Sequence, residues 1–184
     1  PELVRHYGEP FGDSSAIPTY YVAKMTREHV TVALTGDAGD ECFAGYPRYR
    51  AVKLGRWLDR VPGGLRRLAG RCAEMLPVSA EPKTLLRRAQ KFARFLNCPP
   101  RERYLQWIAI FDHAQKLSLY SDDLRDKLGD IDSLGVLDRH YDSFAGNDFV
   151  NATTFVDMQT YLPDDLLVKV DIATMCHSLE ARSP

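Results

Sequence analysis

A short apolar run followed at once by a glycine-punctuated acidic loop restricts the fold more than any other part of the chain. Residues Val30 to Leu34 are β-branched or apolar and predict a buried β-strand. The preceding residues, with serines as cap residues and an early proline, predict a helix over 19–29. A helix, an apolar strand and a polar glycine loop in this order indicate a parallel α/β unit, in which ligands bind beyond the carboxyl ends of the strands.

The loop Gly36-Asp37-Ala38-Gly39-Asp40-Glu41 combines small residues with three carboxylates. Small residues let backbone N–H groups approach an anion, while Asp37, Asp40 and Glu41 offer the hard oxygen ligands that Mg²⁺ prefers. Because Mg²⁺ completes its shell with water and phosphate oxygens, the loop predicts a magnesium–nucleotide site. An acidic surface turn is the competing interpretation, and spacing alone does not separate the two.

From Arg48 onward, apolar residues recur at helical spacing. The stripes lie within residues 54–61, 65–72, 85–96 and 104–111, and proline or glycine residues separate them. Such stripes predict helices that pack into a core and do not indicate a cofactor site. The fold class that we expect is therefore α/β and mostly helical, with part of a parallel sheet and a large helical section.

Charge is divided unevenly along the 184 residues, whose formal net charge is −1. The stretch from Arg48 to Arg103 holds 15 basic and four acidic residues, a net charge of +11, and the remainder carries −12. A phosphate- or nucleic-acid-binding surface is one interpretation. We favour solvated helix faces, or a face that meets the acidic remainder or a missing domain, because the basic residues alternate with apolar ones at helical spacing.

Membrane and secreted classes find no support in the sequence. No apolar run approaches the roughly 18 residues that a membrane span requires, and residues 1–6 do not resemble a signal peptide. The cysteines are scattered and form no Cys-x-x-Cys pair, which favours reduced thiols and a cytoplasmic location. The chain opens without Met and stops after an extended-looking segment at Pro184, so we expect a fragment of a longer protein.

A second stretch with candidate catalytic residues runs from Leu162 to Asp171. A proline followed by two acids predicts the start of a helix there. Lys169 follows among apolar residues, where a fixed ammonium could balance phosphate charge in a transition state. The competing interpretation is a helix-surface lysine paired with Asp165, four residues before it, and the residues alone favour that interpretation.

Three ordered stretches resemble the glutamine-dependent asparagine synthetases. Residues 35–46 resemble the "SGDGGDELFGGY" segment of that family, residues 162–171 with 178–184 resemble its "LPDDLLVKVDRASMAxSLEARVP", and residues 9–20 resemble its "EPFADPSAIPTY". The middle of the chain is recognisable only as helical. The resemblance implies an ATP-pyrophosphatase (adenine nucleotide α-hydrolase-like) fold, with residues 1–184 forming part of the C-terminal synthetase domain.

The resemblance also implies a reaction. Such enzymes use ATP and Mg²⁺ to convert the aspartate side chain to β-aspartyl-AMP, and ammonia made from glutamine in an N-terminal glutaminase domain displaces AMP. Neither the upstream phosphate loop nor that glutaminase domain occurs in residues 1–184, so we expect half of a nucleotide site, inactive by itself. A homodimer is compatible with this interpretation. The alternatives are amidation of another carboxylate, and a nucleic-acid-binding or RNA-modifying relative of the same fold.

The resemblance assigns nucleotide and metal roles residue by residue. Thr35 and Gly36 fall where the family contacts ATP, and Asp40 falls where it holds Mg²⁺ on the pyrophosphate. Glu41 and Tyr46 occupy further positions of the same motif and are expected to support cofactor binding.

Two catalytic residues are implied in the same way. Asp37 occupies the acidic position assigned to substrate orientation or to proton removal from ammonia, and Lys169 matches a lysine that stabilises charge on the phosphates. The chain departs from the family pattern at Ile172, where an arginine is usual, and at Ala38 and Ala44, where glycines are usual. Either alanine would cost roughly 1 kcal/mol if its position needs a positive φ.

Overall fold

The computed structural model describes residues 2–75, 85–111, 113–129 and 134–183. The chain divides into two compact units. The first, which we call the sheet unit, consists of Pro1–Gly45 and Thr154–Pro184, and the second, the helical unit, consists of Tyr46–Thr153.

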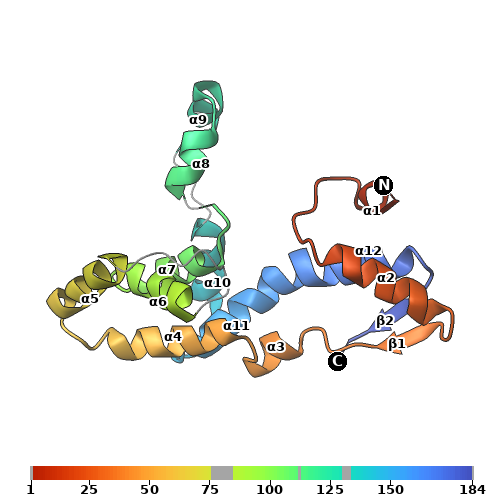
Figure 1. Cartoon of the computed structure of the whole chain (residues 1–184), viewed down its shortest axis with the longest axis horizontal. Helices are drawn as coiled ribbons and strands as arrows, with labels where there is room; N and C mark the ends of the chain where they lie inside the picture. Colours follow the sequence, from red (N-terminus) through yellow and green to blue (C-terminus); the bar gives the residue numbers. More distant parts are fainter. Residues whose placement is uncertain (1, 76–84, 112, 130–133, 184) are drawn as a thin grey trace. The chain divides into compact units, whose positions relative to one another are not determined.

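Two parallel strands define the sheet unit (Figure 1). Strand β1 (Val32–Leu34) pairs with β2 (Glu180–Arg182), and Ala33 stands opposite Ala181. The Glu180 amide donates to the carbonyl of Thr31, and the Thr35 amide donates to the carbonyl of Arg182, so the ladder extends past both ends of β1. The parallel pairing confirms the predicted α/β class.

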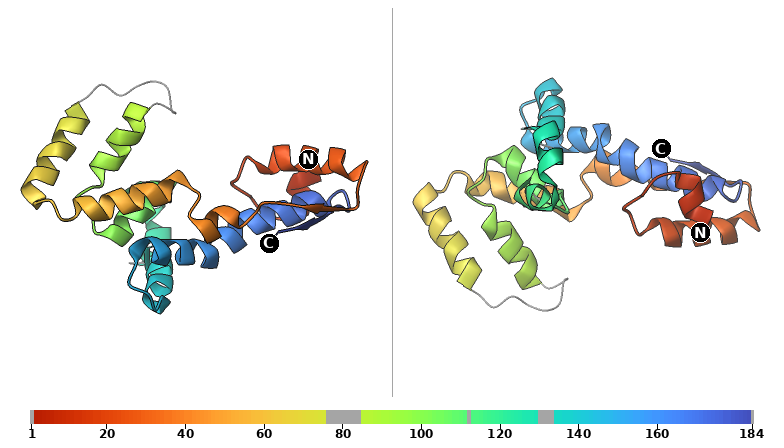
Figure 2. Two further views of the ribbon diagram at one scale, coloured as in Figure 1. Left: turned by 90° about the horizontal axis from the view of Figure 1, so that it is seen from below. Right: turned by 90° about the horizontal axis from the view of Figure 1, so that it is seen from above.

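Helices α2 and α12 lie side by side in this unit (Figure 1, Figure 2). Ala16 and Ala23 of α2 and Ala173 of α12 are buried, and small side chains let two helix backbones approach closely. The helices of the sheet unit are α1 (Glu2–Tyr7), α2 (Ala16–Arg27), α3 (Gly39–Phe43), the end of α11 (Phe149–Gln159), the π-helix η1 (Leu162–Leu167) and α12 (Val168–Met175).

The helix expected over residues 19–29 begins earlier, at Ala16, and ends at Arg27. The reason lies in the residues before it. The amide of Ser15 donates to Asp13 Oδ1 at 2.8 Å, and the amide of Ala16 donates to the carbonyl of Asp13 at 3.1 Å. This local turn starts the helix one turn before the proline-based prediction.

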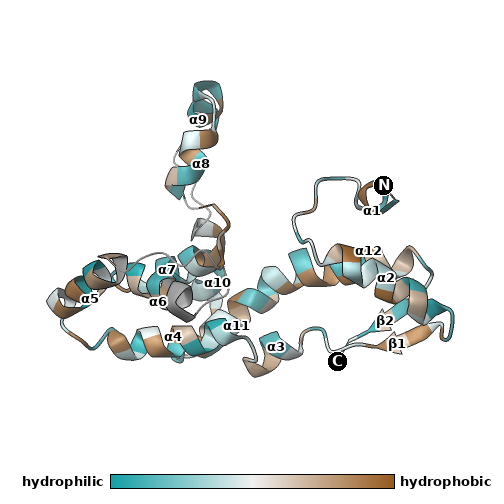
Figure 3. Ribbon diagram, in the orientation of Figure 1, coloured by the Kyte–Doolittle hydropathy of each residue, from teal (hydrophilic) through white to brown (hydrophobic). Residues whose placement is uncertain are grey.

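The strand is shorter than expected, and its predicted burial is wrong for this unit. Val32 is 40% exposed and Leu34 is 87% exposed, although β1 is among the hydrophobic segments in Figure 3. Within the described residues β1 pairs with β2 alone. A sheet of two strands has too little structure around it to bury both faces of a strand that is apolar throughout.

The helical unit contains short helices joined by loops. Helix α5 packs against α6, and α7 packs against both α4 and α10. Tyr49, Val52, Tyr104 and Tyr141 are buried at these contacts. The helices are α4 (Pro47–Leu58), α5 (Gly63–Met75), α6 (Leu85–Arg94), α7 (Pro100–Ile108), α8 (His113–Leu119), α9 (Asp122–Leu128), α10 (Leu134–Ser143) and the first residues of α11.

The four apolar stripes predict helices where α4 to α7 occur, but they do not predict all of the buried faces correctly. Leu54 and Trp57 of α4 are 48% and 60% exposed, and Leu65 and Leu68 of α5 are each 59% exposed. Helix α4 buries Tyr49, Val52 and Gly55 instead, because its contact with α7 uses a different face. No helix in the described part of the chain is both long and apolar enough to cross a membrane.

Candidate functional site

The acidic loop of residues 35–41 leaves the carboxyl end of β1. Because the Thr35 amide donates to the carbonyl of Arg182 at 2.8 Å, the loop starts directly beside the carboxyl end of β2. The amide of Gly39 donates to the carbonyl of Gly36 at 3.2 Å, which closes the loop into a tight turn before α3. The loop therefore occupies the edge at which parallel α/β sheets bind their ligands.

The three carboxylates of the loop have different environments. Asp40 is exposed, Asp37 is half-buried, and Glu41 is 1% exposed. Neither carboxylate oxygen of Glu41 has a hydrogen-bond partner among the described residues. Because an unpaired buried carboxylate is costly, Glu41 calls for a cation or a hydrogen-bond donor from outside this set of residues.

Gly45 determines where the Asp40 side chain can lie. The Gly45 amide donates to the Asp40 carbonyl at 2.9 Å, and a Cβ atom built on Gly45 would collide with the Asp40 carboxylate. The carboxylate therefore rests directly against the Gly45 backbone. Any larger residue at this position would move it.

The backbone on either side of α3 is strained. Ala38 has φ of 71° and Ala44 has φ of 53°, so both adopt the left-handed conformation that favours glycine. The sequence-based expectation for these two positions is confirmed, because each alanine stands where the backbone requires a positive φ. Each costs roughly 1 kcal/mol relative to an unstrained residue.

The loop fits a magnesium ion that is shared with phosphate. Mg²⁺ commonly takes one or two carboxylates and fills its remaining positions with water and phosphate oxygens. The exposed Asp40 can supply one carboxylate, and no group of three or more potential metal ligands occurs among the described residues. With Asp40 as one carboxylate ligand, the loop suits a metal bound together with a nucleotide.

Lys169 is a buried cation in the sheet unit. Its Nζ lies 2.7 Å from Asp13 Oδ2, and the two side chains are 10% and 22% exposed. The interpretation of Lys169 as a surface lysine paired with Asp165 is therefore wrong, both in exposure and in partner. Within the described residues Lys169 makes no hydrogen bond or ion pair with the loop 35–41, so no direct contact joins it to Asp37.

Asp13 and Asp165 differ in their relation to this cation. Burial acts to raise the pKa of Asp13, but hydrogen bonds from Lys169 and Ser15 outweigh it and leave the pKa below its ordinary value. Burial raises the pKa of Asp165, the charge of Asp13 raises it further, and Lys169 opposes both. Asp13 is thus the counter-ion of Lys169, whereas Asp165 is a nearby carboxylate whose charge is disfavoured.

The N-terminal segment is attached to the same cluster. The Tyr7 hydroxyl donates to the carbonyl of Lys169 at 3.2 Å, and the Tyr7 ring stacks on Phe11 with centroids 4.4 Å apart. Burial raises the pKa of Tyr7, and the charges of Cys176, Asp13 and Asp165 add to this shift. The phenol therefore stays protonated and can keep donating to α12.

Tyr46 is the first residue of the helical unit, whereas the other expected site residues belong to the sheet unit. The Arg48 guanidinium lies 4.3 Å from the centre of its ring. This contact explains the local position of Tyr46, and its assignment to cofactor binding stays a prediction.

Part of the basic stretch is used within the helical unit. The guanidinium of Arg103, whose side chain is 2% exposed, donates to both carboxylate oxygens of Asp59, at 2.7 and 3.0 Å. Arg66 also donates to Asp59, and Arg101 donates to Asp138 and Asp142. Solvated helix faces therefore describe this stretch incompletely, since some of its arginines hold the helices together.

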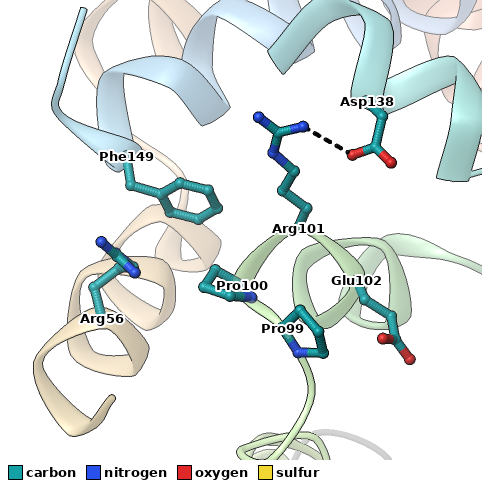
Figure 4. A pocket seen from close by; sticks show the side chains of 7 residues that line it. All are labelled: Arg56, Pro99, Pro100, Arg101, Glu102, Asp138 and Phe149. Atoms are coloured by element: carbon teal, nitrogen blue, oxygen red, sulfur yellow. Dashed lines mark hydrogen bonds and ion pairs between the residues drawn. The ribbon is translucent and has the colours of Figure 1, made fainter. Parts of the chain in front are cut away.

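A pocket of about 400 Å³ opens in the helical unit (Figure 4). Its two arginines are balanced by two acids, and Arg101 already donates to Asp138 at 3.2 Å. The pocket therefore offers no net charge that would select an anion. Its lining consists of Arg56, Pro99, Pro100, Arg101, Glu102, Asp138 and Phe149.

Sequence reasoning missed Asp13 and Ser15 as site residues. An aspartate two residues before a serine at the start of a helix is a recognisable local turn signal, and Asp13 lies inside one of the motifs quoted above. Its partner Lys169 is 156 positions further along the chain. No periodicity or spacing rule connects residues at that separation.

Comparisons with known proteins agree along the whole chain. The family model described as asparagine synthase matches residues 1–184. Asparagine synthetase [glutamine-hydrolyzing] 1 of Bacillus subtilis is 33% identical over the whole chain, which spans 27% of that relative. A putative asparagine synthetase [glutamine-hydrolyzing] of Mycobacterium tuberculosis is 35% identical, again over the whole chain and 26% of the relative. The chain thus spans about a quarter of the length of these relatives, and no solved structure matches it.

Proposed function

The chain belongs to the asparagine synthase family, and we propose that it supplies the second half of the synthetase site in an ATP-dependent asparagine synthetase that takes its ammonia from glutamine. In this proposal the segment works in the cytoplasm as part of a longer polypeptide, which also carries a phosphate loop and a glutaminase domain. Its small-molecule substrates are ATP, aspartate and ammonia.

The position of the acidic loop carries this proposal. Residues 35–41 begin at the paired carboxyl ends of β1 and β2, with Asp40 exposed and Asp37 half-buried. A nucleotide at this edge would meet a small-residue turn at Thr35 and Gly36 and a carboxylate at Asp40. Glu41, which follows Asp40 in the chain, is buried and unpartnered among the described residues, and this favours a cation or a hydrogen-bond donor near the loop.

Each proposed residue has a separate task in the transfer of AMP to the aspartate side chain. Asp40 would hold Mg²⁺, which when bound neutralises charge on the pyrophosphate. Lys169 would place a fixed ammonium where phosphate charge develops during formation of β-aspartyl-AMP. Asp37 would then orient the attacking ammonia or accept a proton from it, because its half-buried carboxylate lies on the same loop.

The test is aspartate-dependent release of pyrophosphate from ATP by the full-length protein, with ammonium chloride replacing glutamine. Stimulation by aspartate supports the proposal, whereas stimulation by a different carboxylic acid would redirect it to another amidation. No stimulation by any acid, together with binding of RNA that weakens steeply with salt, would favour the RNA-modifying alternative.

A metal-ligand variant makes the test specific to the loop. Asp40→Asn should lower turnover at least a hundredfold while leaving the fold intact, because an exposed loop carboxylate contributes little to a core. Asp126→Asn, which removes an exposed carboxylate from α9, is the matched control and should keep full turnover. Near-normal turnover of Asp40→Asn at ordinary Mg²⁺ concentrations would remove Asp40 from the site.

A further inference from the structure

The ammonium of Lys169 is held by one partner that is itself held firmly. Asp13 Oδ2 accepts from Lys169 Nζ at 2.7 Å and from Ser15 Oγ at 2.7 Å, while Asp13 Oδ1 accepts from the Ser15 amide at 2.8 Å. Three donors thus converge on one carboxylate. Such a carboxylate has little freedom to turn, and its position fixes the ammonium.

The ammonium is not saturated by this contact. A lysine has three N–H donors, and within the described residues Asp13 is the one hydrogen-bond acceptor of Lys169 Nζ. The side chain is nevertheless only 10% exposed. A buried cation with spare donors has a stronger field than a cation on the surface, because fewer water molecules screen it.

Asp165 is a second carboxylate near Lys169, but the ammonium does not pair with it. It precedes Lys169 by four residues, a separation at which acid–lysine pairs form on α-helices. Asp165 lies in the π-helical turn η1, and it forms no ion pair with Lys169 within 4.0 Å, although the two charges influence each other. Asp13 therefore draws the ammonium away from the acid on its own helix.

We infer that Asp13 is a positioning residue for Lys169: its carboxylate, fixed by Ser15, holds the ammonium away from Asp165 with donors left over for an anionic group. This inference rests on the proposed function, because it takes Lys169 to act on phosphate charge. It assigns a role to the segment between α1 and α2, which the sequence motifs leave without one.

The experiment compares the rate constant kcat and the KM for ATP in the full-length protein, with saturating aspartate and ammonium chloride. Asp13→Asn keeps the size of the side chain, but it removes the negative charge and leaves one accepting oxygen for the three donors. We expect kcat to fall at least tenfold with less than a threefold change in KM. Glu28→Gln, which removes an exposed acid just after α2, is the control and should change neither value.

A double variant separates positioning from mere support of the fold. If Lys169 turns to Asp165 once Asp13 is lost, the double variant Asp13→Asn with Asp165→Asn should recover at least threefold of the lost kcat. Lost packing or a lost turn before α2 would not be restored by a second substitution on η1. A double variant no faster than Asp13→Asn overturns the inference.

Two further variants cover the remaining outcomes. If Asp13→Asn does not fold, Ser15→Ala decides: it removes one of the three donors to Asp13, and kcat should fall two- to fivefold at unchanged KM. An unchanged kcat in Ser15→Ala would then overturn the inference. Lys169→Ala tests the proposed function separately, since full activity of that variant rejects the role of Lys169, whereas inactive Lys169→Ala with fully active Asp13→Asn rejects only the role of Asp13.

Discussion

Arg103 of the helical unit and Lys169 of the sheet unit are both buried cations, but they differ in how fully their donors are used. In the helical unit, Arg103 donates to both oxygens of Asp59 and to the carbonyl of Leu96, so its guanidinium is well satisfied. In the sheet unit, Lys169 has one acceptor among the described residues and Glu41 has none. The first arrangement holds helices together, and the second leaves polar groups free to meet a ligand.

Backbone strain differs between the two units. The non-glycine residues with positive φ in the described chain are Ala38, Ala44 and Ser178, and all three belong to the sheet unit. Two of them, Ala38 and Ala44, flank α3. Strain and unsatisfied polar groups both cost stability, and proteins retain them mainly where function requires it. The concentration of positive-φ residues in the sheet unit therefore supports a site there.

The largest expected effect concerns Arg103, the buried cation whose donors are used in hydrogen bonds. Arg103→Ala leaves Asp59 without its bidentate partner and opens space beside Gly55, where an added Cβ atom would lie 3.2 Å from the guanidinium carbon. We expect the helical unit to lose about 3–5 kcal/mol of stability. Hydrogen exchange of the amides in α4 and α7 measures this loss.

The control for that experiment is Arg67→Ala, which removes an exposed arginine from α5. It should change stability by no more than about 0.5 kcal/mol. Equal effects of the two substitutions would show that Arg103 does not hold the unit together, and the contrast with Lys169 would then fail.

The next prediction concerns the close contact between Gly45 and Asp40. Gly45→Ala forces the Asp40 carboxylate from its position, at a cost of about 1–3 kcal/mol. If Asp40 binds Mg²⁺, the metal concentration for half-maximal turnover should rise about tenfold or more. Gly135→Ala, at an open position in α10, should leave it unchanged. An unaltered Mg²⁺ requirement in Gly45→Ala would contradict the assigned ligand.

A smaller effect measures the backbone strain at the C-terminal end of α3. Ala44→Gly should stabilise the sheet unit by about 1 kcal/mol, because glycine adopts a positive φ without a steric cost. The same substitution within α4, Ala51→Gly, should destabilise by about 0.5–1 kcal/mol, since glycine weakens a helix interior. Hydrogen exchange reports both changes in stability. Changes of the same sign in the two variants would contradict backbone strain at Ala44.

The smallest expected effect is a change in unfolding temperature that has opposite signs for variants of Asp13 and Asp165. The pKa of Asp13 is lowered from 3.8, so its ionised form stabilises the fold above that pH, and the contribution is lost as the pH falls through the lowered pKa. The pKa of Asp165 is raised, so its ionised form opposes folding at neutral pH. At pH 7, Asp13→Asn should therefore lower the unfolding temperature, and Asp165→Asn should raise it slightly.

Acidification provides the check on these two variants. As the pH falls first through the raised pKa of Asp165 and then through the lowered pKa of Asp13, the difference between each variant and the unsubstituted protein should shrink. Two variants that shift the unfolding temperature in the same direction at pH 7 would show that Asp13 and Asp165 do not divide the roles of counter-ion and unpaired neighbour.

Local patterns in the chain were sufficient for much of the architecture. The apolar run before a glycine loop predicts β1 and its parallel class, and the stripes from Leu54 to Phe111 predict helices where α4 to α7 occur. The alanines at positions 38 and 44 stand where glycine is usual in the resembling motif, and the backbone there has a positive φ. These features depend on side-chain size, branching and spacing over a few residues, which the amino-acid order contains directly.

Contacts between distant segments could not be obtained in that way. The spacing of four residues predicts that Lys169 pairs with Asp165 on a helix surface. In the folded chain, Asp13 contacts Lys169 instead and the ammonium is buried. The exposed stripes of α4 and α5 and the buried Arg103 reverse the usual expectation for apolar and charged residues. The physical reason is that burial and pairing depend on which segments meet in space. The strength of hydrophobic and ionic interactions depends on distance in space and not on separation along the chain.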